Sequence, residues 1–98
     1  MVEKVLLLRL MSREELDIEF REAVARVNDH GEPFPADTLL KLYAYYKKAT
    51  NDYGRPKSKK AIINAFKTNA LFQAKDLDED EAKQNYIDLV NNYFLYRK

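Results

Sequence analysis

The chain has 98 residues and contains no cysteine, no tryptophan, two glycines and three prolines. This length allows one small domain with a single core, and the lack of cysteine excludes a disulfide framework or a thiolate metal site. A net charge of +1 does not fit a dedicated nucleic-acid-binding domain, which is usually basic as a whole. The scarcity of glycine and proline favours helices over a β-sandwich or barrel.

The chain opens with an apolar run at residues 5–10. The run is far shorter than the ~20 residues that span a bilayer, and the polar residues after it offer no small-residue cleavage site. We therefore expect a cytoplasmic protein without stable membrane insertion, in which residues 1–11 are an N-terminal extension and residues 12–98 form the domain. The apolar residues predict an extension of the first helix, or packing on the bundle. A dimer through residues 1–10 is the alternative to a monomer.

A first helix is predicted over residues 12–28. Ser12 and Glu15 have the spacing of a capping box, which satisfies the first backbone N–H groups of a helix. Apolar residues then recur at the helical period: Leu16, Phe20, Ala23, Val24 and Val27. The turn-rich segment 28–35 ends this helix.

A second helix is predicted from Asp37 or Thr38, either of which can cap it, to about Thr50. One face carries its apolar and aromatic residues: Leu39, Leu42, Tyr43, Tyr46 and Ala49. The segment 51–56 contains glycine and proline and predicts the next break.

Ser58 is the predicted cap of a third helix that ends near residue 76. Its period places Ile62, Phe66 and Ala70 inward, with Lys60 and Lys67 on another face. Asp78 and Glu81 repeat the capping-box spacing and predict a fourth helix. Its inward residues are Ala82, Tyr86, Leu89, Val90 and Tyr93. Four helices and no alternating strand pattern predict an all-α fold, a four-helix bundle.

Tyr43, Tyr46 and Lys47 lie within about one turn of the second helix, on neighbouring positions of one face. A phenol and an ammonium group together offer an anion a hydrogen bond and a charge. Taken alone, such aromatics more often belong to a core, and a lysine is usually exposed to solvent. Residues 55–67 add five basic residues and no acid, which fits a small anionic ligand better than a polymer.

The second-helix pattern Tyr-x-x-Tyr-Lys-x-Ala-Thr, at residues 43–50, closely resembles a motif of the acyl-CoA-binding protein family. The resemblance extends over about residues 16–90. Further matches follow in the family's order: Arg55-Pro56, Lys67, Ala82 and Tyr86-Ile87. The family's two tryptophans correspond to Thr68 and Leu71, and a lysine late on its first helix corresponds to Asn28.

The resemblance implies a bundle of the acyl-CoA-binding protein type that binds long-chain fatty acyl-CoA esters and acts as an intracellular carrier or buffer. It implies no catalysis and no cofactor, the acyl-CoA being the ligand. The residues that it implies for ligand binding are Tyr43, Tyr46, Lys47, Lys67 and Tyr86. Lys60 is added as a substitute for a basic contact that falls at Ile63.

Two alternatives stay open. A helical interaction domain of the same fold could have lost acyl-CoA binding, which the missing tryptophans favour. A phosphate- or nucleic-acid-binding domain could use residues 55–67. An enzyme is not expected, because the sequence offers no nucleophile–base pair and no phosphate-cradling glycine loop. No metal site is expected from the lone His30 or from the acidic segment 76–81, which a helix cap explains.

Overall fold

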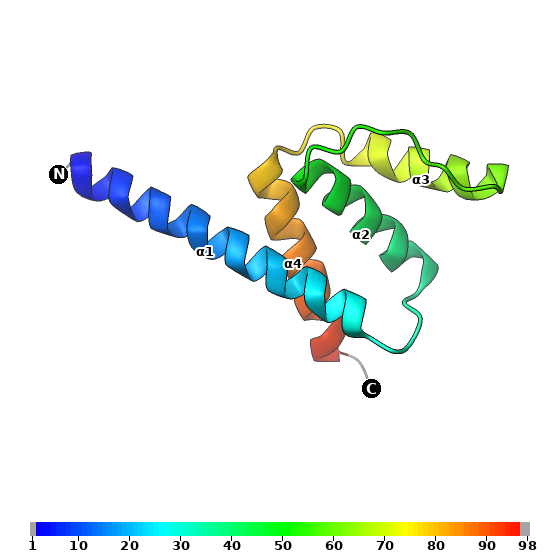
Figure 1. The fold of residues 1–98 in the computed structure, drawn as a ribbon, viewed down its shortest axis with the longest axis horizontal. Coiled ribbons are helices and arrows are strands. Elements are labelled where there is room, and N and C mark those ends of the chain that lie inside the picture. Colours follow the sequence, from blue (N-terminus) through cyan, green and yellow to red (C-terminus); the bar gives the residue numbers. More distant parts are fainter. Residues whose placement is uncertain (1, 97–98) are drawn as a thin grey trace.

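The protein folds into four helices and no strand over residues 2–96, the part that this computed structural model describes; side chains are described from residue 13. The helices are α1 (Val2–Asp29), α2 (Ala36–Ala49), α3 (Ala61–Gln73) and α4 (Glu79–Tyr96), shown in Figure 1. This confirms the predicted all-α four-helix fold. Within the described residues, none of the helices is long and apolar enough to cross a bilayer.

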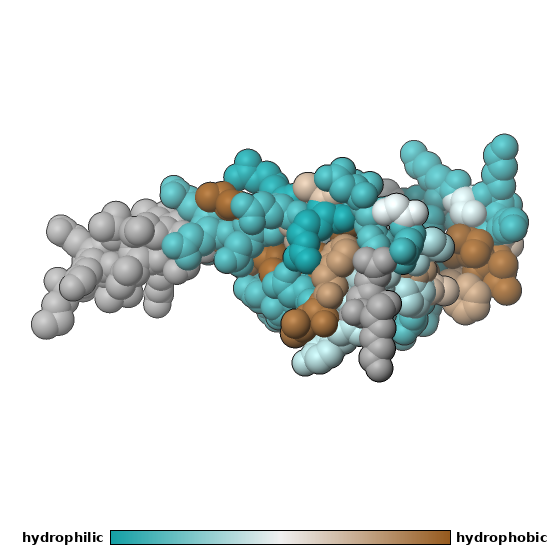
Figure 2. All heavy atoms as spheres, turned by 90° about the horizontal axis from the view of Figure 1, so that it is seen from below, coloured by the Kyte–Doolittle hydropathy of each residue, from teal (hydrophilic) through white to brown (hydrophobic). Residues whose placement is uncertain are grey.

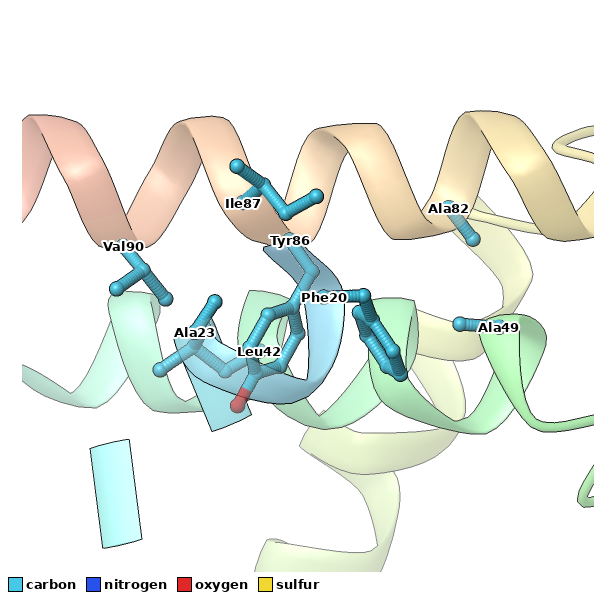
Figure 3. Packing of buried hydrophobic residues seen from close by; sticks show 8 residues of the cluster. All are labelled: Phe20, Ala23, Leu42, Ala49, Ala82, Tyr86, Ile87 and Val90. Carbon is cyan, nitrogen blue, oxygen red and sulfur yellow. The ribbon is translucent and has the colours of Figure 1, made fainter. Parts of the chain in front are cut away.

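The core lies where α4 packs against both α1 and α2. Eight buried residues from these three helices form it, as Figure 3 shows: Phe20, Ala23, Leu42, Ala49, Ala82, Tyr86, Ile87 and Val90. Most of the apolar period predicted for the first, second and fourth helices therefore faces inward, whereas Leu39 and Tyr46 of α2 remain 47% and 43% exposed. Small alanines on each helix allow the close approach of the backbones that a compact core needs.

The first helix begins at Val2 and not at Ser12, where the capping box predicted its start. The prediction that the N-terminal apolar residues extend this helix is confirmed. The capping-box residues Ser12 and Glu15 lie inside the helix. Residues 2–11 contain leucine, lysine, glutamate, arginine and methionine, which are strong helix formers, and no glycine or proline. A local cap signal does not begin a new helix when the preceding residues are themselves helical. Figure 1 shows this first part of α1 projecting beyond the other helices.

The start of α4 is the predicted one. The Asp78 carboxylate accepts the Glu81 backbone N–H at 2.8 Å, as an N-cap does. That hydrogen bond lowers the pKa of Asp78 below its ordinary value.

The predicted caps of α2 and α3 are wrong. Helix α2 follows Pro35 and has no side-chain cap, so neither Asp37 nor Thr38 caps it. Helix α3 begins after Lys60, also without a side-chain cap. Ser58 instead stabilises the turn before it, where its hydroxyl accepts the Lys60 N–H at 3.2 Å. Asn64 holds the same turn through two hydrogen bonds to the Ser58 backbone.

Helix α3 contributes no buried residue to the described part of the protein, contrary to the predicted inward face. Ile62 and Phe66 remain 62% and 51% exposed. The physical reason is that α3 packs against α2 alone. Figure 1 shows it at the edge of the molecule, away from α1. The predicted period is present, but this apolar face is directed outward.

Candidate functional site

The candidate site begins at the C-terminus of α2, where the chain reverses direction. Asn51 adopts a left-handed conformation with φ of 54°, a common way to end a helix. The Thr50 hydroxyl donates to the Tyr46 carbonyl at 2.8 Å, and the Asp52 N–H donates to the Lys47 carbonyl at 2.9 Å. These bonds fold the loop that follows back over the last turn of the helix.

Lys47 is buried under this loop, with only 7% of its surface exposed. Its ammonium group donates a hydrogen bond to the Gly54 carbonyl and lies 3.9 Å from an Asp52 carboxylate oxygen. The expectation that a lysine here would be solvent-exposed is therefore wrong. The loop covers the aliphatic stem, while a carbonyl and a carboxylate compensate the charge.

Tyr43 lies next to two ammonium groups. Lys47 Nζ is 5.4 Å from the centre of its ring and Lys67 Nζ, contributed by α3, is 5.0 Å from it. The Tyr43 hydroxyl is buried and has no hydrogen-bond partner among the described residues. An unpaired buried hydroxyl costs about 1–3 kcal/mol, so a ligand group that accepts a hydrogen bond from it would recover this free energy once a small side-chain movement gives access.

Beside Tyr43, a groove of about 310 Å³ runs between α1, α2 and α4. Its lining is mainly apolar and aromatic: Val24, Val27, Asn28, Leu39, Leu42, Tyr43, Tyr46 and Tyr86. The Phe20 ring packs against two of these aromatic residues. Its centre lies 5.2 Å from that of the Tyr86 ring and 6.1 Å from that of the Tyr46 ring, on which it stacks. Burial, with a smaller effect of Tyr46, raises the pKa of Tyr86 to about 12, so its phenol is neutral at physiological pH.

The structure brings together five of the six predicted ligand residues. Tyr43, Tyr46 and Tyr86 line the groove, and Lys47 and Lys67 lie on the Tyr43 ring. The sixth, Lys60, is exposed at the start of α3. Its ammonium group makes no hydrogen bond or ion pair within the described residues.

Several residues of the site were missed as site residues. The aliphatic lining of the groove (Val24, Val27, Leu39 and Leu42) was predicted only as helix packing, and that apolar period was its signal. Asn28 was noted only as a missing lysine, yet it lines the groove. The Gly54 carbonyl that holds Lys47 had no sequence signal beyond the turn itself.

Thr68 and Leu71, where the family has tryptophans, border a second cavity of about 450 Å³. Its other wall is the loop 53–56, and Asn64 completes it. The cavity therefore lies between α3 and the loop that covers Lys47.

No group of three or more His, Asp or Glu side chains that could hold a metal ion occurs in the described part of the chain. His30 lies instead in an aromatic cluster, with Nε2 3.3 Å from the Tyr93 hydroxyl and its ring 4.9 Å from that of Phe34. Asp78 is occupied as the cap of α4.

Comparison with known proteins identifies the family. The sequence profile described as "Acyl CoA binding protein" matches residues 17–90. The chain belongs to the acyl-CoA-binding protein family. The crystal structure of acyl-CoA-binding protein 2 from rice, Oryza sativa, superposes on this family member with a TM-score of 0.68 at 25% sequence identity. The match covers 82% of this chain and 91% of the rice chain. Among curated proteins, no sequence matches the chain.

The matched range lies entirely after residue 11, and the bundle type predicted from the resemblance is confirmed. Which residues of this family member contact a ligand stays a prediction.

Proposed function

We propose that the protein binds long-chain fatty acyl-CoA esters and acts as a non-enzymatic carrier and buffer for them in the cytoplasm, with no cofactor. Membership of the acyl-CoA-binding protein family supports this. The observation that carries the assignment to the groove is the buried, unpartnered hydroxyl of Tyr43. It lies where the apolar groove meets two ammonium groups, so one ligand with a charged end and an apolar end would satisfy both regions.

The phosphate groups of coenzyme A would lie at Tyr43 and Lys67. Lys67 Nζ makes no hydrogen bond or ion pair within the described residues and is held only against the Tyr43 ring. It can therefore turn toward a phosphate, to which lysine binds as a compact point charge. The Tyr43 hydroxyl would donate a hydrogen bond to the same group.

Lys47 would contribute differently from Lys67. Its ammonium group already donates to Gly54, so its direct contact with phosphate would require that bond to be shared or exchanged. Even without contact, a buried cation raises the positive potential at the Tyr43 hydroxyl. Lys60 is the weakest of the proposed contacts, because it lies apart from the other five.

The acyl chain would occupy the groove between α1, α2 and α4. Leu39 and Tyr46, 47% and 43% exposed, are large apolar surfaces that a chain would cover. Each buried methylene contributes about 0.8 kcal/mol, so several in the groove would add substantially to affinity. Because the Tyr86 phenol is neutral, covering it with an acyl chain does not bury a charge.

Titration calorimetry with palmitoyl-CoA, free coenzyme A and palmitate tests the proposal. Palmitoyl-CoA should bind far more tightly than either fragment, because each fragment keeps only one half of the contacts. Equal affinity for coenzyme A and palmitoyl-CoA would remove the groove from the mechanism.

The second candidate is a helical interaction domain that has lost acyl-CoA binding. The cavity beside Thr68 and Leu71 favours it, since contacts that tryptophans would make there are missing. Absence of binding by all three compounds, in protein shown to be folded by circular dichroism, would support this candidate instead.

A further inference from the structure

The outward face of α3 is an exposed apolar surface. Ile62 and Phe66 lie one turn apart on this face and are 62% and 51% exposed. Phe72, farther along the helix, is 65% exposed, and Ile63 is 37% exposed. Figure 2 shows an apolar patch at the end of the molecule where Figure 1 places α3, with hydrophilic side chains next to it. Large apolar side chains grouped in this way mark an interaction surface.

The chain around this apolar face carries only positive charge. Residues 55–75 contain six basic residues and no acid: Arg55, Lys57, Lys59, Lys60, Lys67 and Lys75. Three of them, Lys57, Lys59 and Lys60, directly precede the first turn of α3 and are exposed. Exposed apolar side chains on a helix, with exposed lysines in the segment that precedes it, are the two kinds of side chain that an anionic membrane surface attracts.

We propose that α3 and the segment before it, residues 57–72, dock onto the surface of an anionic lipid bilayer. Ile62 and Phe66 would enter the boundary between headgroups and acyl chains. Lys57 and Lys59 would stay at the level of the headgroups, their stems along apolar surface. The helix would lie in the plane of the interface, as a peripheral contact.

Charge decides between this occupant and a second copy of the chain. Two α3 faces packed on each other would bring lysines of one copy toward lysines of the other, with no acid in residues 55–75 to pair them. A nucleic acid would satisfy the lysines but leave Ile62 and Phe66 without an apolar partner. An anionic lipid surface satisfies both kinds of side chain.

The packing of α3 also suits a docking role. It contacts the other described helices only through α2, so its outer face is free while the core of α1, α2 and α4 stays intact. The groove proposed for acyl-CoA lies between those three helices, although Lys60 and Lys67 belong to both proposals. The substitutions that test docking, at Lys57, Ile62 and Phe66, leave every proposed acyl-CoA contact in place, so the two proposals can be tested separately.

The test is co-sedimentation of the full chain, without acyl-CoA, with two kinds of vesicle: phosphatidylcholine alone, and phosphatidylcholine with phosphatidylserine in equal parts. Binding is expected to the anionic vesicles, weakening as salt is raised because exposed charges are screened. Ile62→Ser/Phe66→Ser should weaken it about tenfold or more, from loss of apolar burial. Lys57→Glu should also weaken it, about threefold to tenfold, by reversing one charge near the surface.

Two matched controls isolate the surface. Ile18→Ser removes an apolar side chain of similar exposure, 49%, from α1. Lys41→Glu reverses an exposed lysine on α2. Both should leave vesicle binding unchanged, and thermal melts should show that all four variants remain folded.

Each of the following results would overturn the proposal. One is equal binding to neutral and anionic vesicles, or to neither. Another is full binding by the Ile62→Ser/Phe66→Ser variant. Tighter binding of a single-stranded oligonucleotide than of anionic vesicles would favour a nucleic acid as the occupant. A dimer in sedimentation velocity that the Ile62→Ser/Phe66→Ser variant no longer forms would favour a second copy of the chain. Absence of vesicle binding together with palmitoyl-CoA binding would contradict the docking proposal alone. Vesicle binding without palmitoyl-CoA binding would contradict the acyl-CoA proposal alone.

Discussion

The bundle divides into two regions that use the same residue types differently. Helices α1, α2 and α4 bury their apolar period in one core, with Val90 only 1% and Ala82 0% exposed. Helix α3 carries two isoleucines, two phenylalanines and a leucine within thirteen residues, yet none of its described residues is buried. The amphipathic period is present in both regions, and only the number of neighbouring helices differs.

This comparison separates stability from recognition. The core region carries the groove and most of its aromatic lining, so its residues serve both packing and the proposed ligand. The α3 region carries Lys67 and the exposed Ile62 and Phe66, which lie outside the buried core. Substitutions of the buried core residues should therefore lower stability, whereas substitutions of these α3 residues should affect binding alone.

The largest contrast is expected for two phenylalanines. Phe20→Ala should lower the free energy of unfolding by about 3–5 kcal/mol, because it removes the ring that supports Tyr46 and Tyr86. Phe66→Ala on α3 should lower it by less than about 1 kcal/mol, because that ring is 51% exposed. Urea unfolding of the two variants measures both values. Equal losses would mean that α3 belongs to the same cooperative core.

The next effect is a pH dependence that arises in the core region alone. The pKa of Tyr86 is about 12 in the folded protein and 10.0 for the unperturbed group. The folded state therefore holds this proton more tightly, and the resulting stabilisation is complete below pH 10 and is lost as pH rises to 12. The loss should reach roughly 2–3 kcal/mol.

Tyr86→Phe serves as the control for that titration. It should lose less stability than the parent protein between pH 10 and 12, measured by urea unfolding at each pH, since other tyrosines and lysines titrate in both proteins. Identical pH profiles would show that burial does not perturb Tyr86.

A smaller effect should separate the two lysines on Tyr43. Lys67→Ala should weaken palmitoyl-CoA binding by about 1–2 kcal/mol with little change in the melting temperature, because its ammonium group is not used by the fold. Lys47→Ala should lower the melting temperature as well, since it removes the donor to Gly54. If Lys67→Ala unfolds the protein and Lys47→Ala does not, the structural and ligand roles are reversed.

The smallest effect is expected from removal of residues 1–10. A chain that begins at Met11 should fold and bind palmitoyl-CoA almost unchanged, because the family match begins at residue 17 and the first buried residue of the described core is Phe20. Calorimetry and sedimentation velocity would measure affinity and any change in self-association. Loss of binding with retained helicity would place these residues in the groove.

The sequence was a good guide where local and tertiary signals agree. Asp78 starts α4 as its capping spacing predicts, and the inward period of α1, α2 and α4 is confirmed because each of them has helices on its packing side. The same reasoning failed at Ser12, where the preceding residues continue the helix. It also failed at Ile62 and Phe66, because periodicity identifies a face but not what lies against it.

The sequence predicted which charged and aromatic residues form the candidate site, but not how they are buried or hydrogen-bonded. The motif at residues 43–50 identified the tyrosines and lysines, and five of the six predicted residues do lie together. Burial of Lys47 could not be foreseen, because it depends on a loop that returns through Asn51 to place the Gly54 carbonyl. The unpartnered Tyr43 hydroxyl likewise depends on the positions of side chains distant in sequence.

The most direct test of the account concerns the Tyr43 hydroxyl. Tyr43→Phe removes only this group, and Tyr45→Phe removes a hydroxyl from a half-buried tyrosine of the same helix that lines a different cavity. Calorimetry should show palmitoyl-CoA binding weakened about tenfold or more by Tyr43→Phe and unchanged by Tyr45→Phe, with the melting temperature of Tyr43→Phe equal to or above that of the parent. Unchanged affinity of a folded Tyr43→Phe protein would contradict the placement of the ligand at this site.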